Sequence, residues 1–347
     1  TLVPTLSANS VVDAQSRSGP TASFSAATLI IDRGAPTVTL SPPTSPNNSS
    51  VLNFAVGSSE VLSGLTAGDF SVLGTGCSVG TPSAASGSAP NLIYTIPISG
   101  CQDGQAVTLT LSQNSVADVA GNTAPGSASS AGPVVVDRTS PTGTISGSTS
   151  SRASTIEFIV TLSESIQGTL DQDDFMVTGT GCAFGSISPS GGNSVIALTG
   201  CSDGSTAGLA FKSSTLVDIA GNVGPGVGAQ STSASTLVDR SLAAISITSP
   251  STPTSSAIAT FGLNFGESTN DVSESDFELV QSVGGTCEVV SFNPASPRNG
   301  LSGLFNVGVS GCAHGNEVAL RLKALSVSDD LGNTGPLAAI TSSTVLI

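Results

Sequence analysis

Short stretches in which apolar and polar residues alternate follow one another along the whole chain. In segment 156–162, apolar residues at every second position alternate with Glu157 and Thr161. A period of two is typical of a half-buried strand with one polar face. The same criterion predicts neighbouring strands at 142–146, 174–178, 182–188, 194–199, 206–211 and 232–238. No segment has convincing helical periodicity, and seven short strands in about 100 residues predict an immunoglobulin-like β-sandwich.

Several short motifs recur about every 105 residues. Val-Asp-Arg occurs at 136–138 and 238–240, and Ile-Asp-Arg occurs at 31–33. An Asp-x-x-Gly-Asn turn begins at Asp118, Asp218 and Asp329. The register of these motifs predicts repeat one at 34–138, repeat two at 139–240 and repeat three at 241–347.

Residues 1–33 match only the end of a repeat. Thr5–Asp13 aligns with Thr110–Asp118, so this segment is expected to form the last two strands of an incomplete preceding repeat. An isolated hairpin is marginally stable in water. We therefore expect its apolar face to be covered, either by a preceding portion of a longer chain, which we favour, or by a neighbouring molecule that pairs with its edges.

The combined motifs resemble a known family. The order is Ser-Glu, then Asp-Phe about ten residues later, then Ser-Gly-Cys-x-Asp-Gly, Val-x-Asp-x-Ala-Gly-Asn and Val-Asp-Arg-x-x-Pro. This order resembles the tandem bacterial Ig-like repeats of large surface and adhesin-type proteins. Repeat three departs from it, with Cys312-Ala313-His314-Gly315 in place of the Cys-x-Asp-Gly string. The resemblance implies an all-β fold of tandem Ig-like sandwiches in an elongated array outside the cell.

Charge and composition exclude several classes of function. The net charge is −15, and only 10% of residues are charged, against about 25% in ordinary domains. Nucleic-acid backbone binding is therefore not expected. No stretch approaches the 18 apolar residues of a membrane-spanning helix, so no membrane insertion is expected within this segment.

The six cysteines fall two to a repeat, as Cys77 and Cys101, Cys182 and Cys201, and Cys287 and Cys312. Metal sites need clustered Cys or His, but no Cys-x-x-Cys is present and the chain has one His. One disulfide within each repeat is the economical pairing. Disulfides predict an oxidising compartment, here the extracellular face of a bacterial cell.

Acidic residues recur at the same places in each repeat. If the linker and the B–C and F–G loops share one end of the sandwich, these carboxylates converge at the repeat junctions. No cofactor is required by the sequence, but calcium could neutralise these carboxylates. Alternatively, the aspartates only shape turns, and Arg33, Arg138 and Arg240 pair with them. The three sets are Asp32, Glu60, Asp69, Asp118 and Asn122; Asp137, Glu164, Asp174, Asp218 and Asn222; and Asp239, Glu267, Asp276, Asp329 and Asn333.

The sequence contains no pattern that indicates a catalytic site. His314 occupies a turn position where repeats one and two carry aspartate, and no Gly-x-Ser-x-Gly elbow is present. The sequence predicts a non-catalytic extracellular stalk or filament segment whose partners are further Ig-like repeats. The alternative is an adhesin module that binds a host, surface or glycan ligand directly, which glycan-array binding would reveal.

Overall fold

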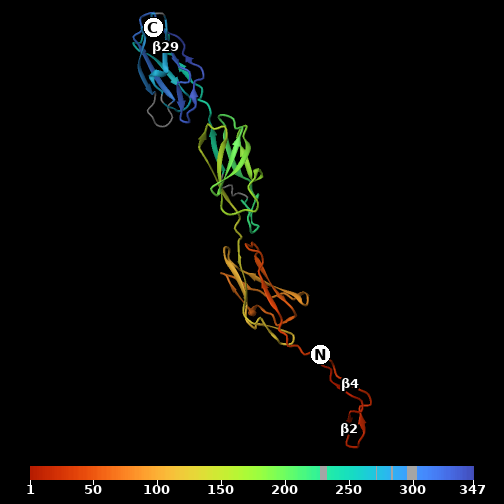
Figure 1. Cartoon of the computed structure of the whole chain (residues 1–347). Coiled ribbons are helices and arrows are strands. Elements are labelled where there is room, and N and C mark those ends of the chain that lie inside the picture. The colour runs from red at the N-terminus through yellow and green to blue at the C-terminus, as the bar shows by residue number, and fades with distance from the viewer. Residues whose placement is uncertain (227–232, 271, 283, 295–302) are drawn as a thin grey trace. The chain divides into compact units, whose positions relative to one another are not determined.

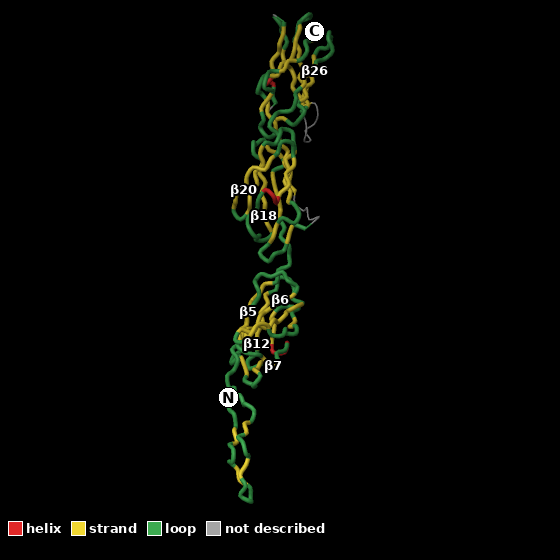
Figure 2. The backbone as a smooth tube through the Cα atoms, turned by 90° about the vertical axis from the view of Figure 1, so that its right-hand side faces the viewer, coloured by secondary structure: helices red, strands yellow, loops and turns green. Residues whose placement is uncertain are grey.

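The computed structural model describes residues 1–226, 233–270, 272–282, 284–294 and 303–347. In this described part, regular structure is almost entirely β-strand, and the helices are three 3-10 turns of three residues each (Figure 2). No described helix has the length and apolar character needed to cross a bilayer. The chain separates into two compact units, residues 1–140 with 217–222 and residues 141–216 with 223–347.

Residues 1–33, which we call the tail segment, form two short antiparallel pairs of strands (red in Figure 1). Strand β1 pairs with β4, and β2 pairs with β3. The strands are β1 (Thr5–Leu6), β2 (Val11–Val12), β3 (Ser18–Gly19) and β4 (Phe24–Ser25).

Repeat one (orange to yellow in Figure 1) has a sheet β10-β11-β6-β5, with β9 also paired to β11, and smaller sheets β15-β12-β8 and β14-β13-β7. Its elements are β5 (Val38–Ser41), β6 (Val51–Ser58), β7 (Leu62–Ser63), η1 (Ala67–Asp69), β8 (Phe70–Leu73), β9 (Ser78–Val79), β10 (Ser86–Ser88), β11 (Asn91–Ser99), β12 (Ala106–Leu111), β13 (Val116–Asp118), β14 (Thr123–Ala124) and β15 (Ser129–Val135).

Repeat two (green in Figure 1) has sheets β16-β18-β21-β20 and β17-β25-β22-β19, with a short pair β23-β24. Strand β17 runs parallel to β25, whereas the other pairs of the two four-stranded sheets are antiparallel. Its elements are β16 (Gly143–Gly147), β17 (Ser150–Ser151), β18 (Ile156–Leu162), η2 (Gln172–Asp174), β19 (Phe175–Thr178), β20 (Ala183–Ser190), β21 (Asn193–Thr199), β22 (Thr206–Phe211), β23 (Leu216–Val217), β24 (Val223–Gly224) and β25 (Ser233–Val238).

Repeat three (blue in Figure 1) has sheets β26-β27-β31-β30 and β28-β33-β34, and a third sheet in which β32 pairs with β29, β35 and β36. Its elements are β26 (Ser246–Thr248), β27 (Ala259–Asn264), β28 (Thr269–Asn270), η3 (Glu274–Asp276), β29 (Phe277–Gln281), β30 (Glu288–Pro294), β31 (Leu304–Ser310), β32 (Glu317–Leu322), β33 (Val327–Asp329), β34 (Thr334–Gly335), β35 (Ile340–Thr341) and β36 (Val345–Leu346).

Three separate apolar cores form, and each lies within one of the three repeat ranges. Alternate residues of the facing strands point inward, so each core draws on two sheets. Phe54, Phe158 and Phe261 are fully buried at equivalent positions of β6, β18 and β27. The chain is therefore a series of tandem β-sandwiches, which confirms the predicted fold class.

The strands of repeat two lie close to the predicted ones. Each of the seven predicted segments overlaps an observed strand whose ends agree with it within two residues. Residue 232 of the predicted strand 232–238 lies outside the described residues. The short strands β17, β23 and β24 and the turn η2 are additional, because two or three residues carry no periodic signal.

Candidate metal sites and arginine clamps at the repeat ends

A tight turn fixes one buried aspartate in each repeat. In repeat one, the Asp118 carboxylate accepts hydrogen bonds from the Asn122 backbone N–H (2.9 Å) and from Asn122 Nδ2 (2.7 Å). In repeat three, Asp329 accepts the same two bonds from Asn333, at 2.8 and 2.7 Å. Both aspartates are 3% exposed. The Asp-x-x-Gly-Asn motif therefore holds a carboxylate in one orientation by hydrogen bonds to its own turn.

A glutamate and a linker aspartate join this buried aspartate. Glu60 comes two residues after β6, and Glu267 comes three residues after β27. Around Glu60 and around Glu267, the three residues offer carboxylate oxygens that lie within 4.8 Å of one another. We call these sets carboxylate group one (Asp32, Glu60, Asp118) and carboxylate group three (Asp239, Glu267, Asp329).

The corresponding residues of repeat two are divided between the two compact units. Asp137 and Asp218 belong to the first unit and Glu164 to the second. Within the first unit, Asn222 Nδ2 donates to the Asp137 carbonyl oxygen (2.9 Å) and to Asp218 Oδ2 (2.7 Å). Asn333 Nδ2 likewise donates to the carbonyl oxygen of Asp239 (3.0 Å). The asparagines therefore connect the turn to the preceding linker as donors.

The structure does not bring Asp69, Asp174 or Asp276 into these groups. Each is the last residue of a 3-10 turn and closes a capping box with the residue that precedes the turn. Asp69 Oδ2, for example, accepts the backbone N–H of Thr66 at 2.7 Å. Burial raises the pKa of Asp174. Local backbone geometry is thus sufficient to account for these three aspartates.

The electrostatics of the carboxylate groups are repulsive. Burial and then the charges of Asp32 and Asp118 raise the pKa of Glu60. Burial, followed by neighbouring carboxylates that include Asp239 and Asp329, raises the pKa of Glu267. By contrast, the hydrogen bond from the Asn122 side chain lowers the pKa of Asp118. Each group therefore gathers negative charge that lacks a cation from the described chain.

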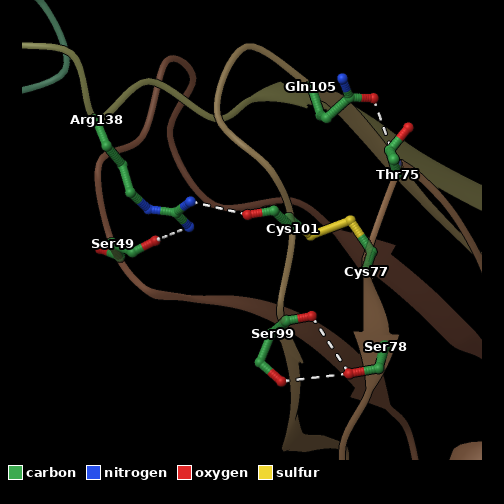
Figure 3. Close-up of a disulfide and its surroundings, with 8 residues drawn as sticks. All are labelled: Ser49, Thr75, Cys77, Ser78, Ser99, Cys101, Gln105 and Arg138. Atoms are coloured by element: carbon green, nitrogen blue, oxygen red, sulfur yellow. Dashed lines mark hydrogen bonds between the residues drawn. A yellow bond between two sulfur atoms is a disulfide. The ribbon is translucent and has the colours of Figure 1, made fainter.

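The linker arginines Arg138 and Arg240 bind backbone carbonyl oxygens and not the carboxylate groups. The Arg138 guanidinium donates to the carbonyl oxygens of Cys101 (2.9 Å) and Ser49 (2.8 Å), as Figure 3 shows. Arg240 donates to the carbonyl oxygens of Cys201 and Ala153 in the same way. Among the described residues, no arginine or lysine forms an ion pair with either carboxylate group. We call this arrangement of guanidinium and two carbonyls the arginine clamp.

A second aspartate completes each clamp. The backbone N–H of Arg138 donates to Asp103 Oδ1 (2.7 Å), and the Thr139 hydroxyl donates to Asp103 Oδ2 (2.7 Å). Asp203 accepts the equivalent bonds from Arg240 and Ser241. These bonds lower the pKa of both aspartates, with the hydroxyl donors as the main cause. Asp103 and Asp203 were not among the predicted site residues, although the recurring Cys-x-Asp-Gly string includes both.

The three predicted disulfides form, as Cys77–Cys101, Cys182–Cys201 and Cys287–Cys312. In repeat one the bridge joins the ends of β9 and β11, next to the pair Ser78 and Ser99 (Figure 3). Gly76 and Gly100 precede the two cysteines with φ of +76° and +75°, and a Cβ on either would lie 2.7 Å from the carbonyl oxygen of the other. Glycine is therefore required before each cysteine of this pair.

The carboxylate groups have the chemistry of a hard-cation site. Calcium takes six to eight oxygen ligands at about 2.3–2.6 Å, so two of its ligands are at most about 5 Å apart. The 4.8 Å limit on the carboxylate oxygens is compatible with that distance. Each of the three carboxylates offers one oxygen at this separation, and water can supply further oxygen ligands to calcium. The donor set therefore fits calcium better than a soft metal, which prefers sulfur or imidazole.

No protein-family model and no curated protein matches the chain. Among solved structures, an I-band fragment from titin matches with a TM-score of 0.33 and 10% identity, covering 90% of this chain and 98% of the fragment. A marsupial T cell receptor matches with a TM-score of 0.25 and 9% identity, covering 89% of this chain and 100% of the receptor. The S-layer protein SbsC matches with a TM-score of 0.21 and 14% identity, covering 89% of this chain and 54% of that protein.

Proposed function

We propose that the chain is a non-catalytic structural segment of an extracellular array or filament on a bacterial surface, built from tandem Ig-like repeats. The observation that carries the proposal is the arginine clamp, which recurs at the ends of repeats one and two with the same acceptors. Charge-assisted hydrogen bonds are stronger than neutral ones. The clamp binds the first linker residues to the preceding repeat, so it limits the movement of the linker relative to that repeat. A restrained linker suits a structural protein made of repeats in series.

The disulfides support an extracellular location. Each repeat carries one bridge between residues 19 to 25 positions apart, and no described cysteine is free. Closing loops of this size stabilises a fold by about 3 kcal/mol on chain-entropy grounds. Disulfides persist mainly in oxidising compartments. The presence of one disulfide in every repeat therefore favours an extracellular location.

We further propose that carboxylate groups one and three bind calcium. The support is the convergence of three carboxylates in each group, together with the finding that no arginine or lysine of the described residues forms an ion pair with them. A bound cation would connect the linker aspartate, the glutamate and the turn of one repeat. The partners in this proposal are further Ig-like repeats.

The function is tested on intact source cells. An antibody raised against the chain should label the cell surface, and external protease should remove that label. Small-angle scattering of the purified chain should give a maximum dimension that decreases when repeat three (241–347) is deleted. Labelling only after lysis, or a compact particle, would contradict the proposal. Binding to a glycan array would favour the adhesin function instead.

A further inference from the structure

The linker between repeats two and three is bound on both sides. Most of repeat two and all of repeat three belong to the same compact unit. The N–H of Asp239 donates to the carbonyl oxygen of Ser151 in repeat two at 3.0 Å. The carbonyl oxygen of Asp239 accepts a hydrogen bond from Asn333 Nδ2 in repeat three, also at 3.0 Å. This one linker residue therefore contacts both repeats.

The next four residues of the linker are also engaged. Arg240 forms the clamp on repeat two, and the Ser241 hydroxyl donates to the aspartate of the same clamp. Leu242 packs against the apolar core of repeat three, and the N–H of Ala243 donates to Glu267 Oε1. Bonds to repeat two are thus followed directly by contacts with repeat three, an arrangement that opposes bending at the linker.

A second connection between the two repeats is made by Arg152. Its Nη1 donates to the carbonyl oxygen of Gly332 at 2.7 Å. Gly332 belongs to the Asp-x-x-Gly-Asn turn of repeat three, and a Cβ on it would lie 3.4 Å from Arg152 Nη1. The residue after Arg152 is Ala153, whose carbonyl oxygen accepts hydrogen bonds from Arg240. One short segment of repeat two therefore binds both the linker and the turn of the following repeat.

Repeat one carries a different residue at this position. The clamp acceptors Ser49 and Ala153 are equivalent, so Asn48 of repeat one aligns with Arg152. A Cβ on Gly221, the glycine of the next turn along the chain, would lie 3.5 Å from Asn48 Nδ2. Both positions therefore lie against the glycine of the turn that follows, but only Arg152 brings a charge to it.

The charges of the turns differ in a matching way. The residue after the first aspartate of the turn is Asp330 in repeat three, whereas it is Val119 in repeat one and Ile219 in repeat two. The turn that Arg152 binds thus carries an additional carboxylate, and the turn beside Asn48 carries an apolar side chain instead. Unlike charges attract one another over about 8 Å at physiological ionic strength, so Asp330 favours an arginine at the neighbouring position.

From this we infer that repeats two and three form one rigid body, and that Arg152 is the positioning residue that fixes their relative orientation. A linker that is attached at one place leaves rotation about that place, and the Arg152 contact supplies a second point of attachment. The surface around Arg152 is thus an interaction surface of repeat two, and the partner that it fits is a glycine carbonyl on an acidic turn. The inference goes beyond the proposed function, because it requires neither calcium nor a cell surface.

Residual dipolar couplings of the intact 347-residue chain test this inference. Repeats that move as one body share one alignment tensor, and repeats that move separately need two. The measurement is made in EDTA, so that no calcium at carboxylate group three restrains the linker. We expect a common tensor for repeats two and three in the original chain and its loss in Arg152→Asn, which introduces the residue of repeat one. Because Arg152 is exposed, the amide shifts of strands β18 to β22 should show that the variant keeps its fold.

Arg321→Asn is the matched control. Arg321 is an exposed arginine of repeat three that pairs with Glu278 at 3.2 Å, so this variant should keep the common tensor. Two tensors in the original chain, or a common tensor retained in Arg152→Asn, overturn the inference. Loss of the common tensor in Arg321→Asn also overturns it, since the loss of any arginine would then have the same effect. Antibody labelling of cells does not depend on Arg152, so failure here is distinguishable from failure of the proposed function.

Discussion

Glu267→Gln should change the stability of repeat three in opposite directions with and without calcium. Glu267 lies with Asp239 and Asp329 in carboxylate group three, whose oxygens are within 4.8 Å of one another. At that separation each like-charge pair costs about 1 kcal/mol even at the dielectric constant of water. Removing the Glu267 charge relieves two such pairs, about 2 kcal/mol in total. For a domain of this size that corresponds to a rise in melting temperature of roughly 8 °C or more in EDTA.

In calcium, the original chain should be more stable than the Glu267→Gln variant, the reverse of the order expected in EDTA. A ligand that binds only the folded state at 100 times its dissociation constant stabilises that state by about 2.7 kcal/mol. Glutamine removes a charged ligand, so the variant should gain less from calcium than the original chain does. Calorimetry in EDTA and in millimolar calcium gives both comparisons, with hydrogen exchange of β32 (Glu317–Leu322) identifying the transition of repeat three.

Glu278→Gln is the matched control. Glu278 pairs with Arg321 at 3.2 Å on an exposed surface, so its loss should cost at most about 1 kcal/mol and be independent of calcium. A Glu267→Gln variant that is less stable in EDTA would refute the repulsion argument. An original chain whose melting calcium leaves unchanged would refute the calcium proposal.

Four further outcomes are expected. Arg240→Ala should destabilise repeat two by about 2 kcal/mol or more in calorimetry, because three hydrogen bonds from the guanidinium to two carbonyl oxygens are lost, and Arg33→Ala should have no effect in the same chain. Phe158→Ala should cost about 3–5 kcal/mol and lower only the transition of repeat two, since that ring is fully buried in a separate core. Reduction with dithiothreitol should lower every transition, by about 3 kcal/mol per bridge. Finally, burial and neighbouring carboxylates raise the folded-state pKa values of Glu267 and Asp239, so the stability that these two groups allow is complete below their unfolded pKa values and is lost as pH rises through the folded ones. In EDTA the melting temperature of repeat three should therefore rise as the pH is lowered from neutral through the folded-state pKa values, and saturating calcium should abolish this rise.

The strands could be predicted because, when one face of a strand is buried, apolar residues recur at every second position of the sequence. Ile156 to Leu162 alternates buried and more exposed positions along β18, as expected. The cysteine pairs were also predictable, since each pair lies within one repeat. Three-residue turns such as η1 gave no periodic signal, so Asp69 was grouped with the other recurring acids although its carboxylate caps the backbone N–H of Thr66.

The role of the linker arginines could not be predicted from adjacency. Neighbouring side chains of an extended segment point to opposite sides. The Arg138 guanidinium donates to the Cys101 and Ser49 carbonyls, whereas the carbonyl oxygen of Asp137 accepts a hydrogen bond from the Asn222 side chain. The turn aspartates were easier to predict, because Asp118 and Asn122 are held together by local hydrogen bonds that their spacing already indicates.

The placement of the disulfides has a consequence for survival among extracellular proteases. Cys182 and Cys201 enclose the hairpin of β20 and β21, whose tip at Gly191 and Gly192 is exposed. Exposed loop tips are preferred sites of proteolytic cleavage. A cut at this tip would leave both fragments covalently joined through the bridge, and the strands on either side would remain paired. Such a chain can be nicked and still remain a single connected molecule.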